Sequence, residues 1–450
     1  MKQKRGRKSP FPQKQSTSDG YTNPLAFLGD DSHLITSGDF RRSNLTTDTE
    51  KLTAMYRENW LAMRIIDMPS EDMTRAWYRL TGSVTEEALN KLRHLEARHS
   101  VKQEITNAIR WARLYGGSLA LMVIRGEENL LDQPLDTDLL LPDCFQGLLV
   151  LERSGGLEPS RELVEDLDDP DFGLPCWYTA DLDPEGSRRV RIHHSRVLRF
   201  TGRELPRTEM IRENYWGASE MEHIWDELQK RSATSANIAQ LVFQANITTL
   251  KMSDFGEVLA GGTDEQKGQI LEAIAQENRL RTSFGLQLLS AEDTMENHPY
   301  NFAGLSEVYE LFMMDMAGAA EIPATRLFGR SPQGMNATGE SDLKNYYELI
   351  AQMQARHLRP AIEKLFPVMA VSCWGKIPDE WEVVFEPVTT MTAGNRAELI
   401  AKRAEPILKA FSLGLLTREE ALEELKESGS EFGVWKRTGG KNPCSTTVPT

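Results

Sequence analysis

The sequence is poor in cysteine and has no long apolar run, and each shortage excludes a class of protein. Its four cysteines, Cys144, Cys176, Cys373 and Cys444, are widely spaced and form no CxxC pair, which favours free thiols in a reducing cytosol over disulfides. No segment approaches the ~18 consecutive apolar residues of a membrane span. The first residues are basic and polar and contain no apolar signal-peptide core. We therefore expect no membrane partner.

Motifs for catalysis and for cofactor or metal binding are also missing. The segment 439–441 ends in the Gly-Lys of a P-loop but has no glycine at the required upstream position, and no GxSxG motif occurs. The histidines include no pair at the i, i+4 spacing of a helical metal site, so we expect them in the core or on the surface. Asp181 begins a stretch similar to a calcium loop, but Ile192 stands where the closing glutamate belongs. We predict no catalytic residue, no cofactor, no metal ligand and hence no enzyme.

Positive charge is in deficit as well. The chain has a formal net charge of −15, whereas a protein that grips duplex DNA by its phosphates shows a basic stripe. The composition therefore disfavours tight DNA binding; it fits an acidic surface along which a duplex slides, or a charge that serves solubility only. Basic residues gather between Lys2 and Lys14, inside a polar segment over 1–44 that we expect to be a disordered arm.

What the sequence does have is a helix, a glycine-rich break and a second long helix over residues 302–366. Apolar residues at helical spacing predict the first helix, which stops at Ile322 because the residue before a proline is pushed out of the α region. The second helix begins after a cap at Thr338 or Ser341, and Pro360 is expected to bend it.

The break over 322–340 carries polar side chains but no nucleophile–base pair and no metal-ligand spacing. A lid over an active site and a loop that touches a passing molecule are both compatible with this pattern, and the side chains favour the second. Glycine adopts several backbone conformations without steric cost, so the glycines of this segment are candidate hinges. The candidate contact residues are Arg326, Arg330, Gln333 and Asn336, and the candidate hinges are Gly329, Gly334 and Gly339.

Two phrases carry a resemblance to a known family. The phrase EIPATRLFGRSPQGMNATGESDLKNYYE over 321–348 resembles the tunnel-loop region of tailed-bacteriophage portal proteins, also called head–tail connectors. The phrase YRENWLAMRIIDMPSEDMTRAWYRL over 56–80 resembles the N-terminal wing helix of one portal branch, formerly known only as a phage-associated protein of unknown function. The similarity runs through about residues 45–430, and neither phrase is a chemical signature.

The resemblance implies a structural role with many partners. Portal proteins form a homo-oligomeric ring, usually a dodecamer, at one capsid vertex of the virion, and double-stranded DNA passes through the ring during genome packaging and DNA ejection. The expected partners are therefore the terminase large subunit, a head–tail adaptor and the major capsid and scaffold proteins. Assembly is expected in the host cytoplasm. In this reading the four contact residues of 322–340 make weak, exchangeable contacts with phosphates.

The resemblance also implies a portal-type arrangement of the chain. The expected parts are a disordered arm (1–44), a wing (45–216 and 341–390, the second part including the long kinked helix), two stem helices (217–244 and 302–321), a clip (245–301), a tunnel loop (322–340), a helical crown (391–430) and a disordered tail (431–450).

Local patterns independently predict an α+β fold. A helix stopped by Gly116 and Gly117 and followed by an apolar strand over 118–126 is a common α+β junction. The stretch 188–201 alternates around a turn at His194-Ser195, which predicts a hairpin. Breaks in helices are expected at Pro69, Pro406 and Gly414. Further strands are predicted over 147–152, 175–180, 368–375 and 381–388.

Two alternatives to a portal remain open on the sequence. The first is a DNA-processing enzyme that uses 322–340 as an active-site lid, which requires a cluster of converging acids. The second is another ring-forming virion connector, such as an adaptor, although adaptors are usually much shorter than 450 residues.

Overall fold

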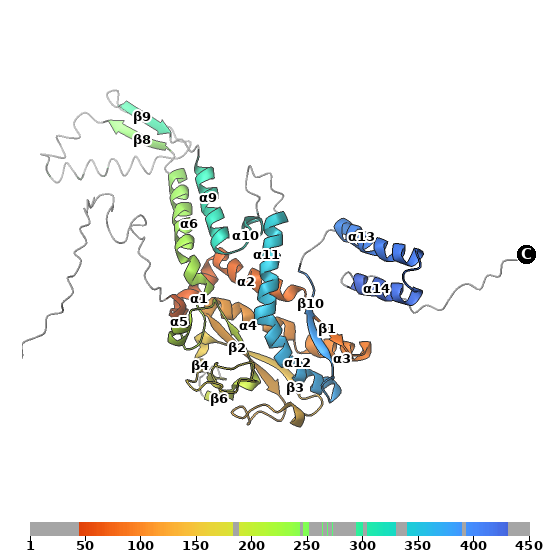
Figure 1. Cartoon of the computed structure of the whole chain (residues 1–450). Helices are drawn as coiled ribbons and strands as arrows, with labels where there is room; N and C mark the ends of the chain where they lie inside the picture. The colour runs from red at the N-terminus through yellow and green to blue at the C-terminus, as the bar shows by residue number, and fades with distance from the viewer. Residues whose placement is uncertain are drawn as a thin grey trace, which may run out of the picture. The chain divides into compact units, whose positions relative to one another are not determined.

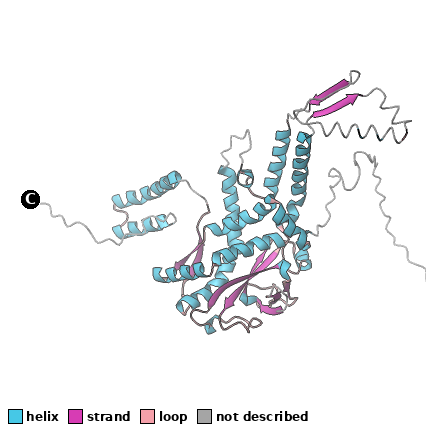
Figure 2. Ribbon diagram, turned by 180° about the vertical axis from the view of Figure 1, so that it is seen from behind, coloured by secondary structure: helices cyan, strands magenta, loops and turns pink. Residues whose placement is uncertain are grey.

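The computed structural model describes residues 45–182, 189–243, 246–251, 294–299, 304–329, 340–388 and 393–430, with the single residues 263, 268 and 272. The predicted arm over 1–44 and tail over 431–450 lie outside this part of the chain, as does most of the predicted clip. The described residues form a mixed fold of helices and small antiparallel sheets, as the sequence predicted (Figures 1 and 2).

Helix α2 (Trp60–Arg75) follows the short helix η1 (Leu45–Thr47) and helix α1 (Thr49–Glu58). The side chain of Asn59 caps α2 by accepting hydrogen bonds from the N–H groups of its first turn. Pro69 was expected to end or restart this helix, but α2 continues through it. Proline cannot donate to the carbonyl of Ile65, and the guanidinium of Arg113 donates to that carbonyl instead, at 3.2 Å.

A three-stranded sheet lies against helix α4 (Val101–Tyr115), which follows helix α3 (Glu86–Arg98). Its order is β3 (Phe145–Glu152), β2 (Gly117–Ile124) and β7 (Val197–Thr201), all antiparallel. The predicted helix–glycine–strand junction is confirmed. Gly117 has to be glycine because a Cβ there would lie 2.2 Å from the ring of Trp216, which is fully buried. The helices η2 (Thr137–Leu139) and η3 (Arg153–Gly155) connect these elements.

The predicted hairpin over 188–201 is wrong. Strand β6 (Arg189–His193) pairs with β5 (Trp177–Asp181) and through it with β4 (Glu158–Pro159), whereas β7 pairs with β2 in the other sheet. The 3-10 helix η4 (His194–Arg196) redirects the chain between the two sheets. The side chain of Arg196 is buried there and pairs with Glu127 at 2.9 Å, a long-range contact that no local alternation reveals.

The long kinked helix is present, and its second half is longer than predicted. Helix α11 (Glu340–Met353) passes through a π-helical turn, η5 (Gln354–Leu358), into α12 (Arg359–Trp374). The turn directly precedes Pro360, so the expected bend lies one turn earlier than the proline itself. The stretch 368–375, predicted as a strand, is the end of α12. A short apolar run buried on all sides looks the same in a helix and in a strand.

The strands β1 (Tyr78–Gly82) and β10 (Trp381–Phe385) form a two-stranded sheet, and β8 (Asn246–Lys251) pairs with β9 (Thr294–Pro299). Helix α13 (Ala393–Ser412) contains Pro406 without ending there, so the predicted break at this proline is wrong, and α14 (Arg418–Ser430) follows a turn at Gly414. None of the helices in the described residues is long and apolar enough to cross a bilayer.

Helices α6 (Glu220–Phe243) and α9 (Leu305–Ala319) lie side by side (Figures 1 and 2), after the short helix α5 (Arg207–Arg212). Arg231 of α6 donates to the Tyr309 hydroxyl at 2.9 Å. At the other end of the pair, Arg203 contacts both Glu220, which begins α6, and Glu321, which follows α9. The two helices therefore run antiparallel. Helix α10 (Ala324–Phe328) follows α9 after a short turn.

Candidate functional site

The side chain of Asp72 is the centre of a cluster that joins three helices. Asp72 lies on the buried face of α2, and its side chain is 5% exposed. Its Oδ2 accepts from the Arg326 guanidinium of α10 at 2.7 Å and from the Tyr346 hydroxyl of α11 at 2.8 Å. Its Oδ1 contacts Arg75 at 3.4 Å. A buried carboxylate is tolerated only when such partners replace its hydration, so the cluster fixes α10 and α11 on α2.

The electrostatics of this cluster favour the ionised pair. Burial alone would lower the pKa of Arg326, but the Asp72 carboxylate together with Tyr346 and Tyr347 outweighs burial and raises it. Burial and the adjacent Asp72 carboxylate together raise the pKa of Tyr346 well above its ordinary value, so this phenol stays a hydrogen-bond donor. The Arg326 guanidinium also lies 5.3 Å from the Tyr346 ring centre.

Helix α10 is held by further contacts on both sides. The main-chain carbonyl of Arg326 accepts a hydrogen bond from the Arg64 guanidinium of α2 at 2.8 Å. The Arg326 guanidinium in turn donates to the Tyr347 hydroxyl of α11 at 3.0 Å. The ring of Phe328 meets that of Trp60 edge-on, with 6.3 Å between their centres. Since α10 precedes the segment 330–339 and α11 follows it, Arg326 ties together the two helices that flank that segment.

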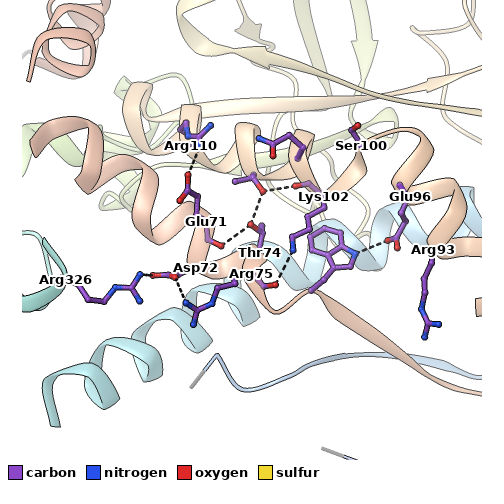
Figure 3. Close-up of a pocket in the computed structure, with 14 residues that line it drawn as sticks. Glu71, Asp72, Thr74, Arg75, Arg93, Glu96, Ser100, Lys102, Arg110 and Arg326 are labelled. Carbon is purple, nitrogen blue, oxygen red and sulfur yellow. Dashed lines mark hydrogen bonds and ion pairs between the residues drawn. The ribbon is translucent and has the colours of Figure 1, made fainter. Parts of the chain in front are cut away.

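An open cavity of about 780 Å³ lies beside the cluster. Figure 3 shows Glu71, Asp72 and Arg75 on α2, with Arg326 entering from the side opposite to Lys102. The acids that line the cavity are all bonded: Glu71 to Arg110 at 3.1 Å, Asp72 as described, and Glu96 to the Tyr78 hydroxyl at 2.7 Å. Its threonine hydroxyls bond each other and main-chain carbonyls.

The acids of this cavity therefore do not form the free, converging set that the enzyme alternative requires. The lining residues also include no histidine and no cysteine. The cavity offers a cationic rim and bonded acids, which suit the docking of a polar surface better than proton transfer.

The structure places two of the seven residues predicted in 322–340. Arg326 lies in α10, so part of the segment predicted as a loop is helical. Gly329 ends that helix with φ +69°, a left-handed conformation that favours glycine. The other predicted residues, Arg330, Gln333, Gly334, Asn336 and Gly339, lie outside the described residues.

Sequence reasoning missed Asp72 and Tyr346, although a signal for Asp72 was present. Asp72 lies three residues after Pro69 and seven after Ile65, on the same face of α2, and both of those residues are buried. An acid at a buried helical position predicts a buried cation as its partner. Which arginine provides it depends on tertiary contacts.

Comparison with known proteins identifies relatives along most of the chain. The family model described as "Phage portal protein" matches residues 50–409. An uncharacterized protein of Haemophilus influenzae is 28% identical over 390 residues, which cover 86% of each chain. The solved structure titled as the neck of an empty GTA particle, computed with C6 symmetry, matches with a TM-score of 0.52 at 14% identity, covering 87% of this chain and 97% of its own. That likeness shows a shared fold.

Two further relatives have a different name. Proteins of Caulobacter sp. (strain RHG1) and Sphingomonas paeninsulae, both called anti-CBASS protein Acb1, are 27% and 31% identical to this chain. The matches cover 79% and 87% of this chain but only 57% and 62% of those proteins. The chain thus spans about three fifths of the length of these two relatives. The anti-CBASS activity that their name describes applies to those two proteins.

Replacing Asp72 by asparagine is expected to destabilise the fold by about 3 kcal/mol, because the Arg326 cation then stays partly buried without its counter-charge. Arg326→Gln is expected to have a similar effect, and the double variant to cost clearly less than the two single costs added. Guanidinium unfolding of the full chain measures these free energies. Arg93→Gln, which removes an exposed guanidinium from the same cavity, is the control and is expected to be near neutral. Strictly additive costs for Asp72 and Arg326 would refute the coupling.

Glu96→Gln is expected to change how stability depends on pH. Burial raises the pKa of Glu96 above 4.5, although the bonds from Tyr78 and Trp77 and the charge of Arg93 oppose this. The stability that Glu96 contributes is therefore complete below pH 4.5, its value when unfolded, and is lost as the pH rises through the folded pKa. The Trp77 Nε1–H and the Tyr78 hydroxyl both donate to the same carboxylate oxygen, Oε1 of Glu96. A glutamine keeps an oxygen at this position and can accept the same two hydrogen bonds.

The variant should consequently gain stability relative to the wild type as the pH rises from 4 to 7, in denaturant titrations at each pH. Glu87→Gln, at an exposed position of the same helix, should follow the wild-type profile. A difference between Glu96→Gln and wild type that stays constant over this range would contradict the assignment.

Proposed function

The chain belongs to the phage portal protein family, and from that premise we propose that it forms a ring-shaped DNA channel at one capsid vertex. In this role it serves genome packaging, head–tail connection and DNA ejection. The family is structural, which favours a mechanical role over the alternative of a DNA-processing enzyme.

The observation that carries the proposal is the exposed apolar surface of helix α9, which packs on α6. On α9 the side chains of Val308 and Leu311 are 47% and 65% exposed in the single chain, although α9 is packed on α6. Large apolar side chains on a helix that already has an intramolecular partner indicate a further, intermolecular one. A heterologous contact between neighbouring copies, repeated by rotation until it closes, produces a ring with a central hole.

The proposed parts follow the order of the chain. The α6–α9 pair would form the stem, the insertion between these helices, with strands β8 and β9, the clip, and the body over 45–216 with 341–390 the wing. The pair α13–α14 would form the crown. In this arrangement the clip meets the terminase large subunit during packaging and a head–tail adaptor afterwards, and the wing contacts capsid and scaffold proteins. A ring of twelve copies is the proposed assembly.

The segment 322–340 is proposed to face the channel axis. The guanidinium of Arg326 is held by Asp72 and Tyr347, so its part is to anchor the segment at the start, while Arg330, Gln333 and Asn336 make weak contacts with passing phosphates. The net charge of −15 per chain repels the duplex from the rest of the wall, which keeps those contacts exchangeable.

The ring itself is tested by placing a charge on the exposed face of α9. Leu311→Glu is expected to abolish closed rings, because it buries a carboxylate without a counter-charge between copies, while the subunit stays folded. Mass photometry and negative-stain imaging of the purified full chain give the number of copies, and circular dichroism checks the fold. Glu307→Gln, an exposed polar change on the same helix, should leave rings intact. A wild-type chain that remains a monomer of 50.9 kDa under several salts would overturn the proposal.

The role of the loop is tested by stiffening it. The double variant Gly334→Ala/Gly339→Ala restricts backbone conformations, so rings should form normally while particles package or retain less DNA. Complementation of a phage or prophage that lacks its own copy, with particle imaging and measurement of packaged DNA, is the assay. Gly155→Ala is the control, since this glycine has no positive φ and an added Cβ makes only an ordinary contact, 3.8 Å from the side chain of Glu152. If particles of the double variant fill with DNA and retain it as the wild type does, the segment 322–340 only connects two helices and the proposed role in the channel is wrong.

A further inference from the structure

The corner where β5 meets β6 gathers residues that the proposed channel does not use. His193 ends β6, His194 begins the turn η4, and Cys176 directly precedes β5. The main chain sets them face to face: the N–H of His194 donates to the carbonyl of Cys176 at 2.9 Å. A potential ligand atom from each of the three side chains lies within 4.8 Å of those from the other two. Both histidines are buried, and Cys176 is half-buried.

A loop before β5 brings two acids to the same corner. Asp169 and Asp171 lie in this loop, and their carboxylates lie within 4.8 Å of each other and of a ring nitrogen of His194. Oδ2 of Asp169 is 3.8 Å from Nε2 of His194. Its other oxygen, Oδ1, accepts the N–H of Asp171 at 2.7 Å, which fixes the turn and leaves Oδ2 facing the histidine.

From this geometry we propose that Cys176, His193, His194 and Asp169 bind one Zn²⁺ ion. Zinc bonds of about 2.3 Å to sulfur and about 2.0–2.1 Å to nitrogen or oxygen put tetrahedral ligand atoms roughly 3.3–3.6 Å apart. The Cys176 Sγ lies 3.9 Å from Nε2 of His193, so this pair and the Asp169–His194 pair each need to close by only a few tenths of an ångström.

Hydrogen bonds on the far side of the two imidazoles set their orientation. The Nδ1 of His193 lies 2.9 Å from the hydroxyl of Ser195 and accepts the main-chain N–H of Ser195 at 3.3 Å, so its Nε2 is the nitrogen that faces Cys176. The Nδ1 of His194 is 3.0 Å from Asp171, which leaves Nε2 for the metal. The carboxylate behind His194 favours the tautomer that metal binding needs, whereas the proton of His193 has to move from Nε2 to Nδ1 on binding, where the Ser195 hydroxyl can accept it.

Charge and protonation suit a dication at this corner. The Cys176 thiolate and the Asp169 carboxylate balance its two charges, while Asp171 is balanced by Lys364, whose Nζ lies 2.5 Å away. Nearby Arg191 and Arg196 pair with Glu162 and Glu127. An imidazole binds zinc only in its neutral form, so the affinity of this corner for zinc falls as the pH is lowered.

Binding replaces one proton on the cysteine. On binding, the S–H bond breaks, the proton leaves to solvent and the sulfur forms the bond to zinc; no electron is transferred. The four ligands are closed around the ion, which assigns it a structural role: it ties the loop with Asp169 to the corner between β5 and β6.

The test measures zinc in the full-length chain after removal of any affinity tag. Protein that is reduced, incubated with Zn²⁺ and desalted should hold one zinc per chain by plasma mass spectrometry, and Co²⁺ in its place should give a thiolate-to-cobalt charge-transfer band. Chelation should lower the thermal unfolding midpoint by several degrees.

Cys176→Ser should reduce bound zinc at least tenfold and remove the cobalt band. Asp169→Asn guards against a folding defect, because its amide oxygen can still accept the N–H of Asp171 while it binds zinc more weakly. Cys373→Ser is the matched control and should hold zinc like the wild type. Absence of zinc from reduced wild-type protein, or full zinc occupancy in both site variants, would overturn the proposal.

Discussion

The buried carboxylate of Asp72 is the constraint on which the arrangement of this chain depends. An ionised acid in a helical core is unstable alone, and here an arginine and a tyrosine from two later helices replace its hydration. Because Arg326 and Tyr346 lie on opposite sides of the segment 330–339 in the sequence, one carboxylate fixes both helices that flank it. The contact segment proposed for the channel therefore starts and ends on a rigid base, whatever conformation its glycines adopt.

Helical periodicity predicted much of the fold correctly because it reports burial along one element. The helices α9 and α11 lie close to where apolar spacing and caps place them, and α6 lies close to the helix expected over 217–244. The errors occur where two structures share one local pattern. The stretch 368–375 is apolar on every side and fits either a buried strand or a buried helix, and the alternation over 188–201 describes two strands without saying that they pair with different partners.

The sites were less predictable than the elements, for the same physical reason. Arg326 was singled out for its charge, but its partner Asp72 is 254 positions earlier in the chain, and only the packed helices bring them together. The cysteine and histidines at the β5–β6 corner have no spacing that suggests a metal, since strand pairing and the turn η4 create their proximity. The place of Pro69 inside α2 was unpredictable for the same reason. It depends on Arg113, which donates to the Ile65 carbonyl that the proline leaves without a helical hydrogen bond.

Arg113 has a second contact, with Glu220 at the first residue of α6, 3.4 Å away. One side chain thus links the proline turn of α2 to the foot of a helix that extends for 24 residues, about 36 Å at 1.5 Å per residue. A small tilt at one end of such a helix is amplified along its length: a tilt of one degree at Glu220 moves the far end by about 0.6 Å. In the proposed ring every copy has the same helix, so a small rotation of α2 would widen or narrow the opening at the far ends of these helices in all copies together.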